Sequence, residues 1–322
     1  MHPAPSREPD WTASADPLGE ALHFLRLSGM FYCRSELRAP WGLTMPAFAN
    51  ALWFHVITQG ECTLEGKHIG ALKLRTGDFV LVPHGDGHRL RSDRRAPTPN
   101  VVELPQRMLS SAYSLLEHGG HGAATTLVCG VVRFDEPAAH DLVAMLPAAI
   151  HLDGTGSSYA DWMAGTLRLM ADEARALRPG GETIITRLAD VLVIQAIRSW
   201  LARDAGGAGG WIAALRDPQI GRAVLGIHRE PDRAWTVGEL AALAGMSRSS
   251  FAAHFNARVG EPPMAFVTRV RMRMAAALLG GQDAGLADLA GRLGYRSEAA
   301  FNRAFKRVIG TTPGAHRRSA TR

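Results

Sequence analysis

The stretch that decides the fold lies in the last third of the chain, where residues 237–260 read VGELAALAGMSRSSFAAHFNARVG and residues 286–310 read LADLAGRLGYRSEAAFNRAFKRVIG. The two segments are copies of one pattern. When Ser247 is aligned with Ser297, 50 positions further on, the two phenylalanines and the closing glycine of each copy keep the same offset. Two copies with this agreement predict a structural repeat.

Each copy predicts two helices joined by a tight turn. The first helix has leucines at helical spacing and stops at a glycine, which can adopt the left-handed conformation that ends a helix. A serine then offers its hydroxyl to the free backbone N–H groups of the next helix. In that second helix two phenylalanines four residues apart anchor one face, so the residues between them lie on the opposite face. An exposed helix face of this kind suits the major groove of DNA.

Between the copies, residues 263–279 predict one long helix. Its length can hold the second helices of the two copies, which would read the DNA, about one DNA turn (~34 Å) apart. With its two helix-turn-helix copies, this segment resembles the DNA-binding domain of the AraC/XylS transcription regulators over about the last hundred residues. The ending GTTPGAHRR at residues 310–318 is similar to the family's closing pattern, with His316 in place of the usual aromatic residue.

The resemblance implies which side chains read DNA bases. By position they are Arg248, Ser249, Ala252 and Ala253 in the first copy, and Glu298, Ala299, Asn302 and Arg303 in the second. The first set has few long polar side chains and therefore suits thymine methyl groups and backbone shape. In the second set Arg303 can pair with a guanine edge and Glu298 can accept from cytosine.

Basic charge is concentrated in the same part of the chain. The formal net charge is +6, but from Trp211 onward there are 17 Lys and Arg residues against 8 Asp and Glu residues. Because cations gain affinity by releasing counterions from phosphate, we expect contacts to the DNA backbone. The candidates are Arg269, Arg271, Arg273, Lys306, Arg307, Arg317 and Arg318. For any one of them the alternative is an ordinary solvated surface cation.

Composition excludes several classes of protein. A hydrophobic content of 46% is typical of a packed protein, and charged or polar residues interrupt every apolar run before it could span a membrane. The first ten residues lack the apolar core of a signal peptide. The three cysteines, Cys33, Cys62 and Cys129, are too scattered for a disulfide framework. We therefore expect a cytoplasmic protein without membrane contact.

The N-terminal part predicts an all-β domain. Residues 1–15 are rich in proline and charge and predict a flexible lead-in, and residues 16–28 predict a short helix. Short strands separated by turn residues are then expected at 30–37, 52–58, 61–64, 79–82 and 126–134. Closely spaced short strands favour a β-sandwich or barrel over residues 16–135.

Within this domain, residues 77–88, GDFVLVPHGDGH, resemble the second cupin motif up to its histidine. The first cupin motif is degraded, because no second histidine follows His55 at the usual spacing. The resemblance implies a cupin-like sensor domain that binds a small effector inside the barrel. The implied pocket residues are Trp53, His55, Phe79 and His88.

These histidines also raise the question of a metal ion. His55 and His88 could remain as two ligands of a cupin metal site, with Cys129 as a third ligand and His121 or His84 nearby. The alternative is a pocket without metal, in which buried histidines are satisfied by hydrogen bonds and the cysteine acts as a small apolar residue. Spacing alone leaves both open.

Residues 136–204 change to helical spacing, with helices expected at 138–146, 159–177 and 182–203. The last has an apolar stripe formed by Ile185, Leu188, Leu192, Ile197 and Leu201. The family resemblance implies that such helices pair two subunits, whereas packing on the barrel of the same chain is the alternative. Residues 205–210 predict a glycine-rich linker. The DNA-binding domain is expected at 211–322, opening with helices at 211–214 and 218–228.

The sequence therefore predicts an α+β multidomain chain: a cupin-like β-barrel, a helical dimerisation segment and an all-α double helix-turn-helix domain. We expect a homodimeric, sequence-specific DNA-binding transcription regulator, with activation as the working assignment, that responds to a small effector and performs no catalysis. The alternative is a metal-dependent cupin enzyme fused to a DNA-binding domain. A pure protein-interaction module would leave the basic charge and the paired helices unexplained.

Overall fold

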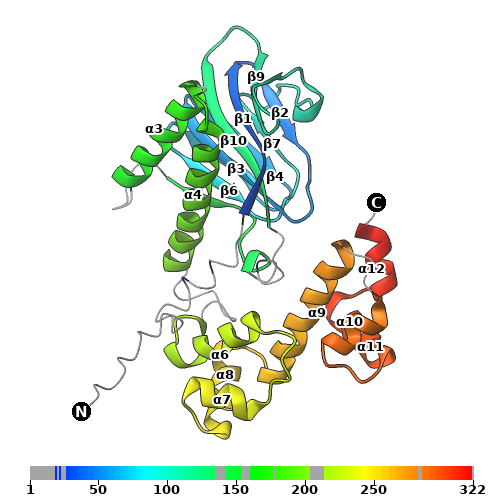
Figure 1. Cartoon of the computed structure of the whole chain (residues 1–322). Helices are drawn as coiled ribbons and strands as arrows, with labels where there is room; N and C mark the ends of the chain where they lie inside the picture. Colours follow the sequence, from blue (N-terminus) through cyan, green and yellow to red (C-terminus); the bar gives the residue numbers. More distant parts are fainter. Residues whose placement is uncertain are drawn as a thin grey trace, which may run out of the picture. The chain divides into compact units, whose positions relative to one another are not determined.

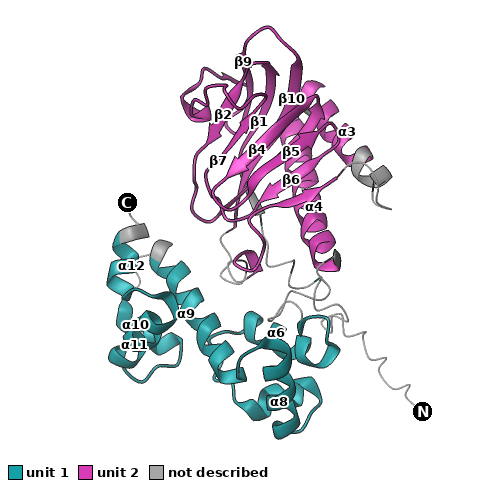
Figure 2. Cartoon of the chain, turned by 180° about the vertical axis from the view of Figure 1, so that it is seen from behind, with its two compact units in different colours: residues 1–25, 206–322 teal, residues 26–205 magenta. Residues whose placement is uncertain are grey.

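The computed structural model divides the chain into two compact units, which Figure 2 distinguishes by colour. The β-rich unit is Arg26–Ala205, and the helical unit is Gly206–Arg322 together with Met1–Leu25. The structure describes residues 27–134, 142–153, 160–176, 178–203, 214–281 and 285–320, together with Gly19, Leu22 and Ala139. The predicted lead-in and the predicted glycine-rich linker lie outside the described residues.

The β-rich unit contains two sheets (Figure 1). The larger has the order β11-β6-β3-β10-β1-β9-β8 and the smaller has the order β2-β7-β4-β5. Neighbours pair antiparallel, except that β1 and β9 run parallel. The strands are β1 (Leu27–Arg38), β2 (Gly42–Met45), β3 (Ala51–Gln59), β4 (Glu61–Gly66), β5 (Gly70–Arg75), β6 (Phe79–Val82), β7 (His88–Arg91), β8 (Arg107–Met108), β9 (Tyr113–Gly119), β10 (Ala124–Phe134) and β11 (Ile150–Leu152), with a 3-10 turn η1 (Val101–Glu103) before β8.

The two sheets enclose one apolar interior. Successive side chains of a strand point to opposite faces of its sheet, so every second residue faces inward. Trp53 and Cys129 of the larger sheet belong to the same buried cluster as Leu43, Leu64 and Leu90 of the smaller sheet. This closed, two-sided arrangement confirms the predicted cupin-like barrel.

Two helices, α3 (Ala160–Ala176) and α4 (Gly181–Arg203), complete the β-rich unit beside the larger sheet (Figure 1). Buried aromatic rings lie on the sheet face that points away from the interior, where Phe54 stacks on Phe79 with ring centroids 6.0 Å apart. Tyr32, on the same face of β1, lies close to Thr186 and Asp190 of α4. The Ser110 hydroxyl also donates to Glu182 at the start of α4. These contacts attach α4 to the barrel of its own chain.

Several strands were not predicted from the sequence. The five predicted strands are all present, but β2, β5, β7, β8, β9 and β11 were missed because they are short or carry charged residues on their outer face. The strand β11 lies in the segment predicted to be helical, yet it pairs with β6, with His151 opposite Val80. Residues 27 and 28, predicted to end a helix, belong to β1.

The helical unit contains both predicted helix-turn-helix copies. Its helices are α6 (Pro218–Arg229), α7 (Val237–Ala244), α8 (Arg248–Val259), α9 (Pro263–Gly281), α10 (Leu286–Arg292), α11 (Glu298–Ile309) and α12 (Pro313–Ala320). As predicted, Ser247 caps α8 and Ser297 caps α11, each accepting a backbone N–H at 3.3 and 3.2 Å respectively. Gly260 and Gly310 end these helices at φ 86° and 85°, in the left-handed region that glycine adopts without strain.

Each copy has its own aromatic anchor. In the first, the ring centroids of Phe251 and Phe255 are 5.4 Å apart, and Phe255 packs edge-on against Phe266 of α9. In the second, Phe301 and Phe305 are fully buried in a cluster with residues from the C-terminal half of α9. The helix α9 therefore contributes to both cores and joins the two copies, as Figure 1 shows. No helix in the described part of the chain is long and apolar enough to cross a membrane.

Candidate functional site

The helix α8 presents the predicted first reading face to solvent. Arg248, Ser249 and Ala253 are exposed, and Ala252 is half-buried. The structure adds Asn256, which is exposed and lies on the same helix face as Ser249 and Ala253, three residues beyond Ala253. The sequence-based assignment missed it because it considered only the first half of this helix. Asn256 supplies an amide that can pair with adenine. The exposed face of α8 therefore has more polar groups than predicted.

The helix α11 presents the second reading face. Glu298, Ala299 and Arg303 are exposed. Asn302 is half-buried, and its Oδ1 is buried with no hydrogen-bond partner among the described residues. Of the four predicted residues, Glu298 and Arg303 are therefore the long polar side chains that are exposed and can reach a base edge.

The predicted backbone-contacting cations fall into two groups. Lys306, Arg307 and Arg318 are exposed, as a phosphate contact requires. Arg269 instead forms an ion pair with Glu261 at 2.7 Å, and its guanidinium lies 4.7 Å from the ring centroid of Phe266. Arg273 and Arg317 are half-buried.

Arg271 has contacts within the chain that the sequence did not predict. Its guanidinium donates to the carbonyl oxygens of Pro231 at 2.8 Å and Arg233 at 2.7 Å. It thereby ties α9 to the loop between α6 and α7, which is a structural role within the helical unit. Sequence could not reveal this, because the two carbonyl groups lie about forty residues earlier in the chain.

The interior of the β-rich unit holds a cavity of about 440 Å³ that opens to solvent at one side, where its lining side chains Val102 and Met108 are 59% and 53% exposed. No side chain with a formal charge lines it. Trp53, which the sequence singled out, forms part of its wall together with Cys129, which was predicted either as a metal ligand or as a small apolar residue. The full lining is Phe31, Cys33, Ser35, Met45, Phe48, Trp53, Val101, Val102, Leu104, Gln106, Met108, Cys129, Gly130 and Val131.

Phe79 was wrongly assigned to this pocket. It stands opposite Val56 on β3, whereas its neighbour Val80 stands opposite His55 and belongs to the interior cluster. Because side chains alternate along a strand, Phe79 points to the outer face beneath the helices. The motif located the strand correctly, but the direction of a single side chain depended on the register.

Beside the cavity, three buried side chains form a chain of hydrogen bonds. Cys129 Sγ lies 3.0 Å from His55 Nδ1, and His55 Nε2 lies 2.7 Å from His88 Nε2. His88 Nδ1 lies 3.0 Å from the carbonyl oxygen of Asp86. His55 stands directly opposite Cys129 in the β3–β10 register, which explains why these two side chains meet. We call this set the buried relay.

The carbonyl group of Asp86, at one end of the buried relay, determines which nitrogen of each ring carries the proton. A carbonyl oxygen only accepts, so His88 Nδ1 carries the proton that it donates to Asp86. Burial lowers the pKa of His88 to about 4, and burial together with His88 lowers the pKa of His55 well below its usual value. Both rings are therefore neutral at pH 7, and His55 Nε2–H donates to His88 Nε2. His55 Nδ1 is left as an acceptor for the thiol of Cys129, whose pKa burial raises well above its usual value.

The same geometry does not fit a three-ligand metal site. The two nitrogens of His55 lie on opposite edges of its ring, one toward His88 and the other toward Cys129, so the three side chains do not converge on one point. The 2.7 Å separation of the two Nε2 atoms is that of a hydrogen bond, whereas nitrogens that share a zinc ion lie about 3.3 Å apart in tetrahedral geometry.

The other predicted ligands do not complete a set. His84 Nε2 lies 2.8 Å from the carbonyl oxygen of Leu146, and His121 is exposed. In the described residues no group of three or more His, Cys, Asp or Glu side chains is arranged to hold a metal ion.

Paired reading helices and a cupin-like barrel together define a DNA-binding transcription regulator with a cupin domain. The comparisons agree: a cupin family model matches residues 16–202, and a helix-turn-helix domain model matches residues 240–319. A putative AraC-like transcription regulator from Streptomyces lividans is 32% identical, over 95% of this chain and 99% of its own length. The chain belongs to the family of AraC-like transcription regulators.

Two further relatives extend the comparison. The RCS-specific HTH-type transcriptional activator RclR from Escherichia coli strain K12 is 28% identical over 83% of this chain and 84% of its own length. Among solved structures, the DNA-binding domain of AdpA, a global transcriptional factor, in complex with a target DNA is 32% identical. That match covers 30% of this chain and 87% of the AdpA domain, with a TM-score of 0.29.

Proposed function

We propose that this regulator binds an uncharged small molecule in the interior cavity and that the bound molecule alters DNA binding by α8 and α11. The observation that carries this proposal is the cavity of about 440 Å³ with no charged side chain in its lining. A charged ligand there would lose its hydration without a compensating ion pair, which makes its burial costly. An apolar molecule with one or two polar groups fits, because Ser35 and Gln106 supply hydrogen-bonding groups in the wall.

The strand β1 offers a route from the cavity to α4. Its alternate residues Phe31, Cys33 and Ser35 line the cavity, whereas Tyr32 faces Thr186 and Asp190 of α4 on the other side of the sheet. A ligand that fits one position of β1 better than another therefore also favours one position of α4. Only this difference in affinity is needed to shift the population of DNA-binding states.

We further propose that the chain acts as a homodimer through α4. The stripe considered from the sequence packs within the chain itself, since Ile185, Leu192 and Ile197 are at most 1% exposed. A different set of apolar side chains remains in solvent: Ile184 on α4 is 41% exposed, Val191 on α4 is 40% exposed and Leu169 on α3 is 47% exposed. Ile184 and Val191 are seven residues apart, the heptad spacing that pairs helices of two subunits.

Size-exclusion chromatography with light scattering tests the dimer. Val191→Glu is expected to yield a monomer because it places a charge in the apolar contact. Thr183→Glu, at an exposed polar position of the same helix, is the matched control and leaves the dimer intact. A wild-type monomer at micromolar concentration, or two dimeric variants, contradicts the proposal.

Activation is the direction we infer, because the E. coli relative is named a transcriptional activator. The cytoplasm is the inferred location, since a transcription regulator must reach DNA. The metal-dependent enzyme considered from the sequence has no supporting observation, because the buried relay does not converge on a metal ion.

Fluorescence anisotropy with a labelled duplex from the region upstream of the chain's own gene tests DNA binding. We expect saturable binding that weakens as salt is raised, because phosphate contacts release counterions. Absence of salt-sensitive binding with every upstream duplex contradicts the DNA-binding function. The cavity is tested separately, without DNA, by the uncharged fluorophore N-phenyl-1-naphthylamine, which is expected to gain fluorescence with wild type and not with Val131→Phe, which fills the cavity.

A further inference from the structure

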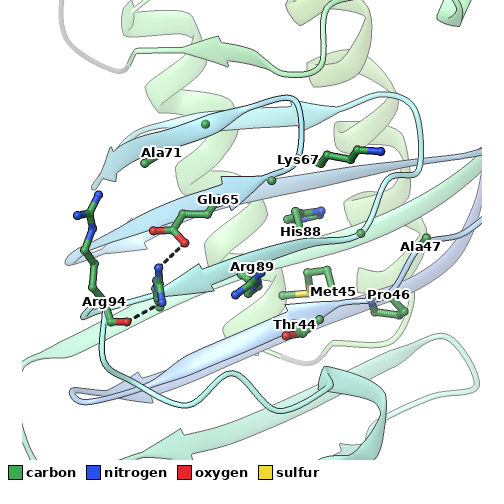
Figure 3. A pocket seen from close by; sticks show the side chains of 14 residues that line it. Thr44, Met45, Pro46, Ala47, Glu65, Lys67, Ala71, His88, Arg89 and Arg94 are labelled. Atoms are coloured by element: carbon green, nitrogen blue, oxygen red, sulfur yellow. Dashed lines mark hydrogen bonds and ion pairs between the residues drawn. The ribbon is translucent and has the colours of Figure 1, made fainter.

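A second, chemically different pocket lies over the outer face of the smaller sheet and around one end of it, where His88 of the buried relay and Met45, which also lines the interior cavity, form part of its wall (Figure 3). Its volume is about 900 Å³. The strands β2, β4, β5 and β7 and the loops that join them form its floor and walls. The lining is Thr44, Met45, Pro46, Ala47, Glu65, Gly66, Lys67, Gly70, Ala71, Gly87, His88, Arg89, Arg91 and Arg94. We call it the outer pocket.

Positive charge is segregated into the outer pocket. The β-rich unit Arg26–Ala205 contains 18 Lys and Arg residues and 18 Asp and Glu residues, so it is neutral as a whole. The outer pocket nevertheless has four cationic side chains and a single acidic one, Glu65. Basic charge here is therefore not a reflection of the average composition of the unit.

One of the four cations is already engaged. Arg91 forms an ion pair with Glu65, and its guanidinium also donates to the backbone carbonyl oxygen of Arg94 at 2.7 Å. Lys67, Arg89 and the side chain of Arg94 are exposed and have no hydrogen bond or ion pair within the described residues. In Figure 3 Arg89 lies between Lys67 and Arg94, which stand toward opposite ends of the pocket.

Glu65 reports the electrostatic environment of the outer pocket. Its pKa is lowered, first by the hydrogen bond from Arg91 and further by the charges of Arg91, Arg94 and Arg89. The carboxylate therefore lies in a net positive field that Arg91 alone does not account for. Arg89 stands directly opposite Glu65 in the β4–β7 register and opposite Thr44 in the β2–β7 register, which places it at the centre of the sheet face.

The walls leave room for a bound molecule. Gly66, Gly70 and Gly87 contribute no side chains, and a Cβ added to Gly70 would meet no atom within 4 Å. Ala47 and Ala71 add only methyl groups. A ligand in the outer pocket can therefore approach the backbone at Gly70, whereas the positions of Gly66 and Gly87 are already close to Ile69 and to the Met45 carbonyl oxygen.

We propose that the outer pocket binds a small multivalent anion of the size of a phosphorylated metabolite, as a ligand separate from the uncharged one of the interior cavity. Lys67, Arg89 and Arg94 supply the charge-assisted hydrogen bonds, and Arg91, held by Glu65, supports the sheet face beneath them. A pocket of about 900 Å³ with three unpaired cations spaced along it favours a compact anion over an extended polymer. The β-rich unit would then bind two chemically distinct ligands, an uncharged molecule and an anion.

Isothermal titration of the full-length protein with pyrophosphate at constant ionic strength tests this proposal. Because the basic helical unit also attracts anions, the comparison is between variants. The double variant Lys67→Gln with Arg89→Gln is expected to weaken the saturable pyrophosphate component by about tenfold or more, since charge-assisted bonds are lost. Arg133→Gln is the matched control, because Arg133 is an exposed arginine on β10 outside the outer pocket.

A second arm measures DNA affinity over a range of salt concentrations. We expect the double variant and Arg133→Gln to bind duplex DNA like wild type. If the double variant binds pyrophosphate as tightly as wild type, the cations are a solvated surface and the proposal is wrong. If it instead loses DNA affinity and salt dependence while pyrophosphate binding is unchanged, the face contacts the DNA backbone, which also overturns the proposal. Neither outcome depends on whether the interior cavity binds an effector.

Discussion

Replacing Cys129 by valine tests the buried relay. Valine is apolar and close to cysteine in size, so the substitution removes the S–H donor with little change in packing. His55 Nδ1, which accepts that proton at 3.0 Å inside a fully buried site, then has no donor. The other neutral tautomer of His55 does not avoid the cost, because it breaks the hydrogen bond to His88 or, if His88 changes tautomer as well, the hydrogen bond to Asp86.

The expected magnitude follows from the buried acceptor. Leaving one buried hydrogen-bonding group unsatisfied costs about 1–3 kcal/mol, whereas a volume-conserving apolar exchange costs less than about 1.5 kcal/mol. Cys62→Val is the matched control, since Cys62 is 5% exposed, similar to Cys129 at 3%, and makes no hydrogen bond within the described residues. We therefore expect Cys129→Val to be less stable than Cys62→Val by about 1–3 kcal/mol.

Urea unfolding of the full-length protein measures this difference. Trp41 and Trp53 are buried in the β-rich unit and Trp235 in the helical unit. Since both valine substitutions lie in the β-rich unit, the difference between the two fluorescence transitions reports that unit. Cys129→Ser provides a further check, because its hydroxyl restores a donor to His55. Equal stabilities of the two valine variants would refute the assigned direction of the proton chain and show that Cys129 acts only as an apolar residue.

Three other predictions concern pH, packing and DNA recognition. The pKa of His88 is about 4 in the folded chain, below the unfolded value near 6.5, so its neutral form stabilises the fold above pH 6.5 and that stability is lost as pH falls toward 4. Urea unfolding should find the chain about 2 kcal/mol less stable at pH 5 than at pH 7 from this group alone, with a shallower pH dependence in His88→Leu. Gly130→Ala should destabilise by about 1–3 kcal/mol in thermal unfolding, because the added Cβ would lie 2.4 Å from the Phe54 ring. The helical Gly291 has open space around it, so alanine there should stabilise by about 0.5–1 kcal/mol, and an equal effect at both glycines would contradict the packing. Arg303→Ala should reduce discrimination between matched and mismatched duplexes by more than Ser249→Ala does, and equal losses in a binding titration would show that the two readers contribute alike.

Local patterns determined the DNA-binding half of this chain from the sequence. Serine caps, glycine stops and phenylalanines four residues apart act within one or two turns of helix, so their meaning does not depend on distant residues. The resulting helices α8 and α11 begin at the predicted residues. The exception is Arg271, whose partners at Pro231 and Arg233 come from another part of the chain.

The β-rich half depended more on tertiary structure. The cupin-like motif located β6 and His88. It did not show which side chains of β6 point inward, because that direction depends on the register with a strand far away in sequence. Phe79 was misplaced for this reason, and Cys129 met His55 only through the β3–β10 pairing. The short charged strands β5 and β7 lack an alternating pattern long enough to recognise.

By itself, then, the sequence determined the class of protein. A repeated helix-turn-helix pattern and a cupin-like strand pair are local patterns, which can be recognised without knowledge of tertiary contacts. Only the tertiary structure decided the chemistry of its sites. It showed that His55, His88 and Cys129 form a hydrogen-bonded relay and not a set of converging ligands. It also placed Lys67, Arg89 and Arg94 along one pocket. Both outcomes depend on side chains from separate strands meeting in space, which spacing along the chain does not specify.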